Sequence, residues 1–272
     1  MSDENNIDEL LTLGNSVLST IDKNSPVGSN ISLYLLSIDV DHKEKHICDA
    51  FMFKPSISNL LRIINNGYLK KHKDDIINKI LSMNFQENDY YELHNHILFS
   101  GKDYYYLLQF FCGNFEEFYN ESINHNKTLG WSSSFQKTLV YLWLLLLNNS
   151  KEKTKCYDKL LYDIFSDIGY DDTENVALGD SISEIWERWK SNFDIPNIIK
   201  PKVLSWLKEI IENRVDAIMK GNYRKAYDRA ALLVISYSEL LSNIEDKEVY
   251  IDYFYNKYSR RSAFKAELEK LI

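Results

Sequence analysis

Histidines beside carboxylates are the residues of this 272-residue sequence whose types and spacing could do chemistry. His94 and His96 follow Glu92 at intervals of two in the stretch YYELHNHILF. On a strand the three side chains would project from one face, and a carboxylate with two imidazoles binds divalent metal ions. On a helix His94 and His96 would lie about 200° apart, because each residue turns the helix by about 100°. They could not then share one ion.

The start and stop signals around this stretch favour a helix. Asn88 or Asp89 would cap it, and Gly101 lies just beyond its end. Apolar residues recur at three and four positions: Tyr90, Leu93 and Ile97. The alternation typical of a strand is also present, so the strand with its metal site stays open as the alternative. The favoured interpretation is a packing helix with polar residues on its surface.

A second pair of histidines, His42 and His46, has the i, i+4 spacing of ligands on one helix face, and Asp49 follows at i+3. The zinc-protease motif needs a glutamate directly after the first histidine, and this sequence has Lys43 there. A solvated charged face explains the segment equally well.

The sequence contains none of the motifs GxxxxGK[ST], GxGxxG, GxSxG or CxxC. Its three cysteines are odd in number and far apart, which fits neither a disulfide framework nor a zinc site and suggests the reducing cytoplasm: Cys48, Cys112 and Cys156. We expect no cofactor. The acidic N-terminus lacks a signal-peptide pattern, and the longest apolar run, residues 139–147, is too short to span a bilayer. No membrane contact is expected.

Basic residues interleave with tyrosines near the C-terminus, in NYRKAYDRAA and YNKYSRRSAFKAEL. Such mixtures can grip phosphates and stack on bases. The candidate partner-binding residues are Arg224, Lys225, Arg229, Arg260 and Arg261. The alternative is an ordinary helix surface outside a close-packed seam: Ala226, Ala230, Val234, Tyr237 and Leu241.

Charge divides the chain unevenly. The net charge is −8, yet residues 196–272 hold 14 Lys and Arg against 11 Asp and Glu. All six histidines precede residue 126, and five of the seven arginines follow residue 200. We therefore expect two regions: an acidic, His-containing helical region over 1–150 and a helical-pair region with a basic end over 151–272.

The elements that position these residues are predicted to be helices. Gly and Pro are scarce, at 9 and 4, which favours long helices with short connections. We expect a helix over 1–22, a loop over 23–30, and a helix capped by Asp41; residues 31–40 fit a strand or a helix. Further on, helix pairs begin near residues 155, 202 and 246, a pitch typical of α-solenoids, although no sequence repeat has that spacing.

The fold class expected is thus all-α: stacked antiparallel helix pairs, solenoid-like or an irregular bundle, with room for a short strand pair near the N-terminus.

The last 60 or so residues add a resemblance. The features that carry it are Arg214, Tyr223–Ala231, Glu239, Tyr258–Arg261, Phe264 and Glu267–Leu268. This segment resembles a helical C-terminal segment of uncharacterised bacterial proteins, some of which carry SWIM-type zinc fingers. The resemblance implies a stacked helical scaffold of bacterial type. A SWIM finger needs clustered cysteines with a histidine, which this chain lacks, so zinc binding is not implied.

The function expected is a non-catalytic helical protein–protein interaction module of a bacterial cytoplasmic system. Its partner would be another protein, and the acidic first two-thirds suits a basic one. Two alternatives are a metal-dependent hydrolase using the histidines of the first half and a nucleic-acid-associated protein using the basic C-terminal helices. A hydrolase should show histidines and carboxylates converging in a cleft, a nucleic-acid binder a continuous basic groove, and an interaction module an exposed apolar patch.

Overall fold

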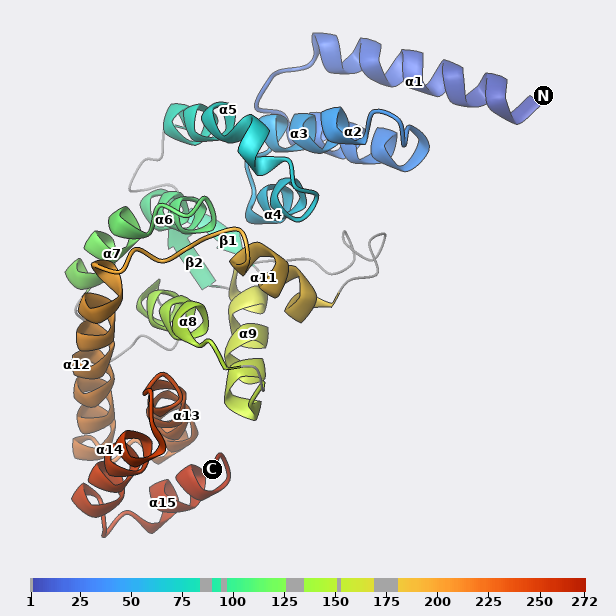
Figure 1. Ribbon diagram of the computed structural model, residues 1–272. Helices are drawn as coiled ribbons and strands as arrows, with labels where there is room; N and C mark the ends of the chain where they lie inside the picture. The colour runs from blue at the N-terminus through green and yellow to red at the C-terminus, as the bar shows by residue number, and fades with distance from the viewer. Residues whose placement is uncertain (1, 84–89, 94–96, 126–134, 151–152, 169–180) are drawn as a thin grey trace.

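The computed structural model describes residues 2–83, 90–93, 97–125, 135–150, 153–168 and 181–272. This part of the chain is almost wholly helical, which confirms the predicted all-α class. Consecutive helices pack on one another and follow a curved arc, with the two termini at its opposite ends (Figure 1). Within the described residues no helix is both long and apolar enough to cross a bilayer.

The N-terminal end of the arc is made of α1 (Ser2–Thr20), α2 (Pro26–Ile38), α3 (Lys43–Phe53), α4 (Ile57–Asn65) and α5 (Leu69–Ser82). The start of α4 is fixed by Ser56, whose side chain accepts a hydrogen bond from the Asn59 backbone N–H. Its end is fixed by Gly67, which takes a φ of +78° that favours glycine. Both Ser56 and Gly67 can be recognised in the sequence as helix boundary signals.

The expected loop over 23–30 is too long: residues 23–25 connect the helices, and α2 begins at Pro26, a position where the first helical turn tolerates proline. Residues 31–38 are therefore helical too. Glycine at position 28 has a packing reason: a Cβ there would collide with the ring of Phe53. Gly28 lets α2 lie close against α3. The next helix also starts later than expected, at Lys43, with His42 rather than Asp41 at the N-cap.

The helix expected around residues 89–99 is also wrong. Tyr90–Leu93 and Ile97–Ser100 form an antiparallel pair, β1 and β2, in which Tyr91 lies opposite Phe99. The helix start signal lies further along the chain: Ser100 and Asp103 form a reciprocal capping box that begins α6 (Gly101–Phe111). This strand pair lies about a third of the way along the chain, not near the N-terminus as allowed for, where residues 31–38 are helical.

The middle of the arc holds α6, α7 (Phe115–Asn124), α8 (Phe135–Leu147), α9 (Lys155–Asp167) and α11 (Ile182–Lys190). Helix α8 is buried along almost its whole surface, as its apolar run predicts. Two indoles lock neighbouring helices: Trp143 donates to the Ser122 hydroxyl at 2.9 Å, and Trp189 donates to the Phe111 carbonyl at 2.9 Å.

The C-terminal end consists of α12 (Ile199–Lys220), a 3₁₀ turn η4 (Arg224–Ala226), α13 (Tyr227–Ser238), α14 (Ile244–Lys257) and α15 (Ser262–Glu269). Within the seam predicted on α13, Ala230, Val234 and Tyr237 are buried. One buried apolar cluster includes residues from Ile47 to Leu268. The proposed division of the chain near residue 150 stays a prediction.

Candidate functional site

The His42 and His46 pair converges on a carboxylate that the sequence argument overlooked. His42 Nδ1 lies 2.9 Å from Asp39 Oδ1, and His46 Nε2 lies 2.8 Å from Asp39 Oδ2. Hydrogen bonds from His46, then His42, lower the pKa of the Asp39 carboxyl. Asp49 does not join them; it lies 3.5 Å from Lys45 Nζ. Asp39 precedes His42 by three residues and His46 by seven, and this spacing could have identified it from the sequence.

Metal-ion coordination is not supported at this cluster. Both oxygens of Asp39 are engaged by imidazole nitrogens, which links the end of α2 to the start of α3. Across the described ranges, no group of three or more His, Cys, Asp or Glu side chains is placed to hold a metal ion. Of the other candidate set, Glu92 is in β1 opposite Leu98. His94 and His96 lie outside the described residues, so that metal site stays a prediction.

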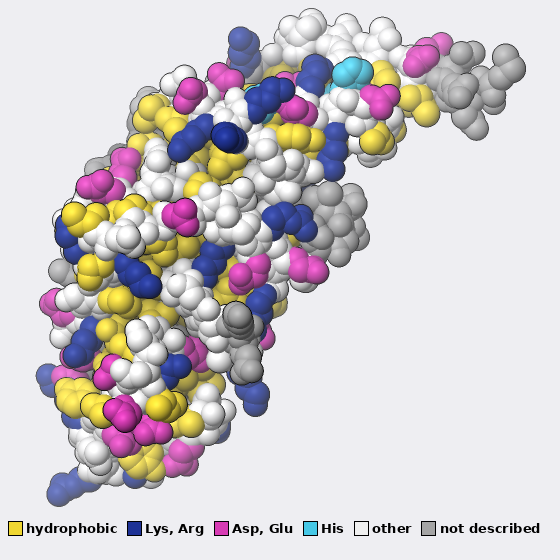
Figure 2. Space-filling model, in the orientation of Figure 1, with side chains coloured by type: hydrophobic (Ala, Val, Ile, Leu, Met, Phe, Trp, Pro, Cys, Tyr) yellow, Lys and Arg dark blue, Asp and Glu magenta, His cyan; other side chains and the backbone are white. Residues whose placement is uncertain are grey.

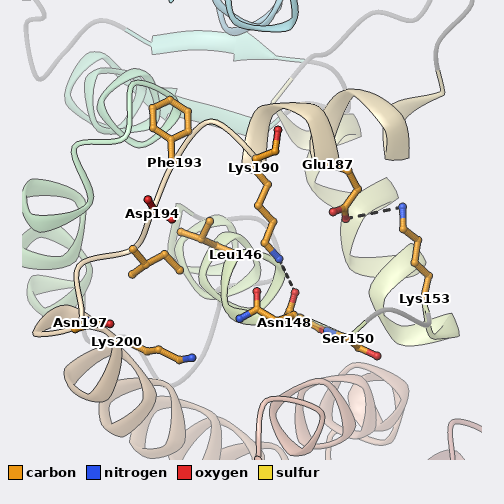
Figure 3. Close-up of a pocket in the computed structure, with 13 residues that line it drawn as sticks. Leu146, Asn148, Ser150, Lys153, Glu187, Lys190, Phe193, Asp194, Asn197 and Lys200 are labelled. Carbon is orange, nitrogen blue, oxygen red and sulfur yellow. Dashed lines mark hydrogen bonds and ion pairs between the residues drawn. The ribbon is translucent and has the colours of Figure 1, made fainter. Parts of the chain in front are cut away.

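A polar pocket of about 670 Å³ opens where the ends of α8 and α11 meet the starts of α9 and α12 (Figure 3). Lys190 reaches from α11 and donates to the backbone carbonyls of Leu145 and Asn148 at the end of α8. Burial lowers the pKa of the Lys190 ammonium. One turn earlier on α11, Glu187 lies 3.8 Å from Lys153.

These contacts give the polar pocket a structural role. Lysine near a helix C-terminus satisfies carbonyls that have no intrahelical donor and complements the negative end of the helix dipole. Lys190 does this for α8. Lys190 and Lys153 thus already have partners within the protein.

A second pocket, which we call the cationic pocket, has a different character. It measures about 700 Å³ and lies where α12 ends and η4 leads into α13. Its lining residues are Arg214, Ile218, Asn222, Tyr223, Arg224, Lys225, Ala226 and Arg229. Three of the five predicted partner-binding residues thus come together: Arg224, Lys225 and Arg229. The fourth cation, Arg214, was not among the predicted site residues.

Arg214 is only 6% exposed, and it follows the apolar spacing of α12: Leu207, Ile211, Arg214 and Ile218 fall at four, three and four. An arginine at an apolar position of a helix is unusual, and this feature could have identified Arg214 from the sequence. Burial, and then the charge of Arg229, lower the pKa of the Arg214 guanidinium.

The two remaining candidates, Arg260 and Arg261, do not line the cationic pocket. Arg261 sits at the N-cap of α15 and donates to the Asn222 side chain at 2.7 Å and the Met219 carbonyl at 3.0 Å. It therefore braces the turn after α12. Arg260 is exposed and has no ion pair within the described part of the chain.

Helix α1 presents an exposed apolar face. Gly14 lies against Leu35 of α2, and Lys45 donates to the Asn15 side chain at 2.8 Å, which fixes how α1 sits on the arc. The large apolar side chains left exposed are Ile7, Leu10, Leu13 and Val17, which we call the α1 stripe. Leu13 is the most open, at 62%. Figure 2 shows hydrophobic side chains beside acidic ones where α1 lies.

Lys and Arg side chains are mixed with Asp and Glu over the face drawn in Figure 2, and they form no continuous basic track there. A protein that follows a nucleic-acid backbone presents such a track.

Comparisons with known proteins do not indicate a function for this chain, so a proposal must start from the surfaces described above. The resemblance of the C-terminal segment to bacterial proteins stays a prediction. No protein-family model, no curated protein and no solved structure matches this chain.

Proposed function

We propose that this protein is a non-catalytic interaction module that binds a basic, amphipathic segment of another protein along the α1 stripe. The observation that carries the proposal is the exposure of four large apolar side chains on one helix at the end of the arc. Exposed apolar residues scattered singly are ordinary, but a row of them on one helix marks an interaction surface.

The stripe has the geometry of a docking seam. With about 100° per residue, Leu10, Leu13 and Val17 fall within about 60° of one another on α1. The neighbouring flank, which includes Gly14, is used against α2. Ile7, one turn nearer the N-terminus, is exposed too, but it falls about 60° from Leu10 on the side of Gly14. A partner helix laid along Leu10, Leu13 and Val17 would cover apolar side chains at the i, i+3 and i+7 positions typical of helix recognition.

Charge favours a basic partner. Residues 2–22 contain five carboxylates and no Lys or Arg. Glu9, which is exposed, borders the stripe on the side away from α2. Like charge would repel anionic membranes and nucleic acid, and helices that lie on membranes are typically rich in Lys and Arg on their polar face. A segment with apolar residues flanked by Lys or Arg is complementary to this surface. The three unpaired, buried cysteines support a cytoplasmic site of action.

The test uses a cross-linker placed on the stripe. All three native cysteines are buried, so Leu13→Cys supplies one accessible thiol for a photoreactive maleimide. Ser16→Cys is the matched control, about 60° further round α1, away from both Leu13 and the flank that faces α2. In lysate of the native host, the proposal expects cross-links from position 13 to a Lys- and Arg-rich segment of another protein, and few from position 16.

A second pair of variants separates binding from folding. Leu10→Lys with Leu13→Lys should abolish the cross-linked complex and leave the helical circular dichroism unchanged, whereas Thr12→Lys with Ser16→Lys should leave the complex intact. Cross-links from position 13 to a second copy of this chain would contradict the proposal, and so would equal yields from positions 13 and 16.

A further inference from the structure

The cationic pocket is independent of the α1 stripe, because it lies near the other end of the arc. Its charge is one-sided. Arg224, Lys225 and Arg229 form no ion pair with any described residue, and the described part of the pocket lining contains no carboxylate. Asp228 neighbours Arg229 in sequence but is exposed and not part of the lining.

The nearest carboxylate on α12 is already engaged elsewhere. Asp216 lies 2.7 Å from Lys257 Nζ and accepts a hydrogen bond from the Tyr258 hydroxyl, so it holds α14 against α12. Three exposed cationic side chains, Arg224, Lys225 and Arg229, therefore line one hollow beside the buried Arg214, and none of the described lining residues is acidic. A bound anion would reduce the repulsion between these charges.

The walls of the cationic pocket are held in place. Tyr223 lies across Gly221, where a Cβ would collide with its ring. Asn222 takes a φ of +53°, and its side-chain oxygen accepts from Arg261 at 2.7 Å and from the Tyr227 hydroxyl at 3.4 Å. This turn presents the Tyr223 ring, 52% exposed, beside the cations. Ile218 and Ala226 add apolar surface to the lining.

We propose that the cationic pocket binds a phosphate monoester carried on an aromatic or other flat apolar group. A phosphate monoester carries a charge of about −1.5 to −2 near neutral pH and three strong acceptor oxygens, which suits several guanidinium groups better than a single carboxylate does. The Tyr223 ring and the aliphatic lining suit the body of such a ligand. A pocket of about 700 Å³ is of the size that encloses a small molecule or one modified side chain.

The start of α13 adds to the attraction. Its N-cap, Ala226, has no side chain that accepts from the first-turn N–H groups, although the Tyr227 N–H donates to the Arg224 carbonyl and Asp228 lies in the first turn. This feature alone would not define a site. Together with the four cationic side chains, the start of α13 favours an anion whose acceptor oxygens point in more than one direction.

The test titrates the whole protein with phenyl phosphate by isothermal calorimetry. Methyl phenyl phosphate, a diester with one negative charge, and benzoate are the matched probes. The monoester should bind and the other two should bind far more weakly. Binding should also weaken as the pH falls through about 6, where the phosphate gains a proton.

Variants locate the site. Arg224→Gln combined with Arg229→Gln should weaken phenyl phosphate binding about tenfold or more, since each charge-assisted hydrogen bond contributes at least that order. Arg260→Gln, which removes an exposed arginine outside the pocket, should leave it unchanged. Both chosen positions are exposed, so the fold should be retained; unchanged thermal melting checks this.

A phosphotyrosyl peptide and a nucleoside 5′-monophosphate present this chemistry on two different bodies, and their relative affinity identifies the source. Three results would overturn the proposal: no binding of phenyl phosphate at millimolar concentration, equal binding of the diester or benzoate, or an equal loss in Arg260→Gln. None of them bears on the α1 stripe, so the two proposals fail separately.

Discussion

Arg261 donates a hydrogen bond to the Asn222 side chain at 2.7 Å, although 39 residues separate them in sequence. The positive end of the helix dipole disfavours cations at a helix start, so acids of the preceding helix would be the expected partners of Arg260 and Arg261. Instead, α15 begins after them at Ser262, and Arg261 secures the turn that ends α12 through Asn222 and the Met219 carbonyl.

Arg261→Ala should therefore lower the free energy of unfolding by about 1 kcal/mol, the order expected for loss of such hydrogen bonds. Arg260→Ala should change it by less than about 0.5 kcal/mol, as for most exposed positions. Urea unfolding of the two variants compares them directly. Equal losses would mean that the Arg261 contacts add nothing to stability.

Phe264 and Trp206 are both buried, with exposures of 0% and 8%. Replacing either with alanine should cost about 3–5 kcal/mol, because the cavity left behind adds to the lost burial. Tyr162, which is 68% exposed, gives the control: Tyr162→Ala should have little effect. Thermal melts of the two core variants within a degree or two of wild type would contradict this prediction.

Asp216 makes stability depend on pH. Burial acts to raise the pKa of this carboxyl, but hydrogen bonds from Lys257 and Tyr258 outweigh it and leave the pKa lowered. A lowered folded-state pKa stabilises the fold above the unfolded pKa, and that stabilisation is lost as the pH falls through the folded value. Asp216→Asn should thus unfold at lower urea than wild type at neutral pH, by about 1 kcal/mol or less for a partly exposed pair.

In acid, where the carboxyl of Asp216 is protonated, the wild-type protein and Asp216→Asn should unfold at nearly the same urea concentration. The control is Asp8→Asn, which removes an exposed charge from α1. If both variants showed the same pH-dependent difference, the effect would come from net charge rather than from the contacts of Asp216.

The cysteines should be unreactive in the folded protein. Burial raises the pKa of Cys48 to about 11 and those of Cys112 and Cys156 to about 12. Since the thiolate is the reactive form, Ellman's reagent should modify none of them at neutral pH and all three after denaturation. A thiol that reacts promptly in the native protein would show that one of these sites opens readily.

Local signals made most helices predictable from the sequence. Ser56 and Gly67 bound α4, and an apolar run with no charged face makes α8 a central helix. Residues 90–100 were not predictable in this way, because their apolar residues fit both the helical and the strand period. Pairing with another strand decided between them, as in the match of Tyr91 with Phe99, and such pairing is not visible in a short window.

The candidate sites were predictable in part. A basic, tyrosine-rich stretch pointed to Arg224, Lys225 and Arg229, but their grouping around Arg214 depends on how the turn after α12 folds back. The α1 stripe was also not predictable from the sequence. Its leucines have the pattern of a packing face, and only the position of α2 shows which of them is covered.

The hydrogen bond from Trp189 to the Phe111 carbonyl has a kinetic consequence. Most helices pack on sequence neighbours and can form early, whereas this contact closes a loop of 78 residues. Chain entropy sets a cost of about 4 kcal/mol on closing a loop of that length. The docking of α11 onto α6 should therefore come late in folding, and the indoles of Trp186 and Trp189, which both pack on Phe110, should report it by fluorescence.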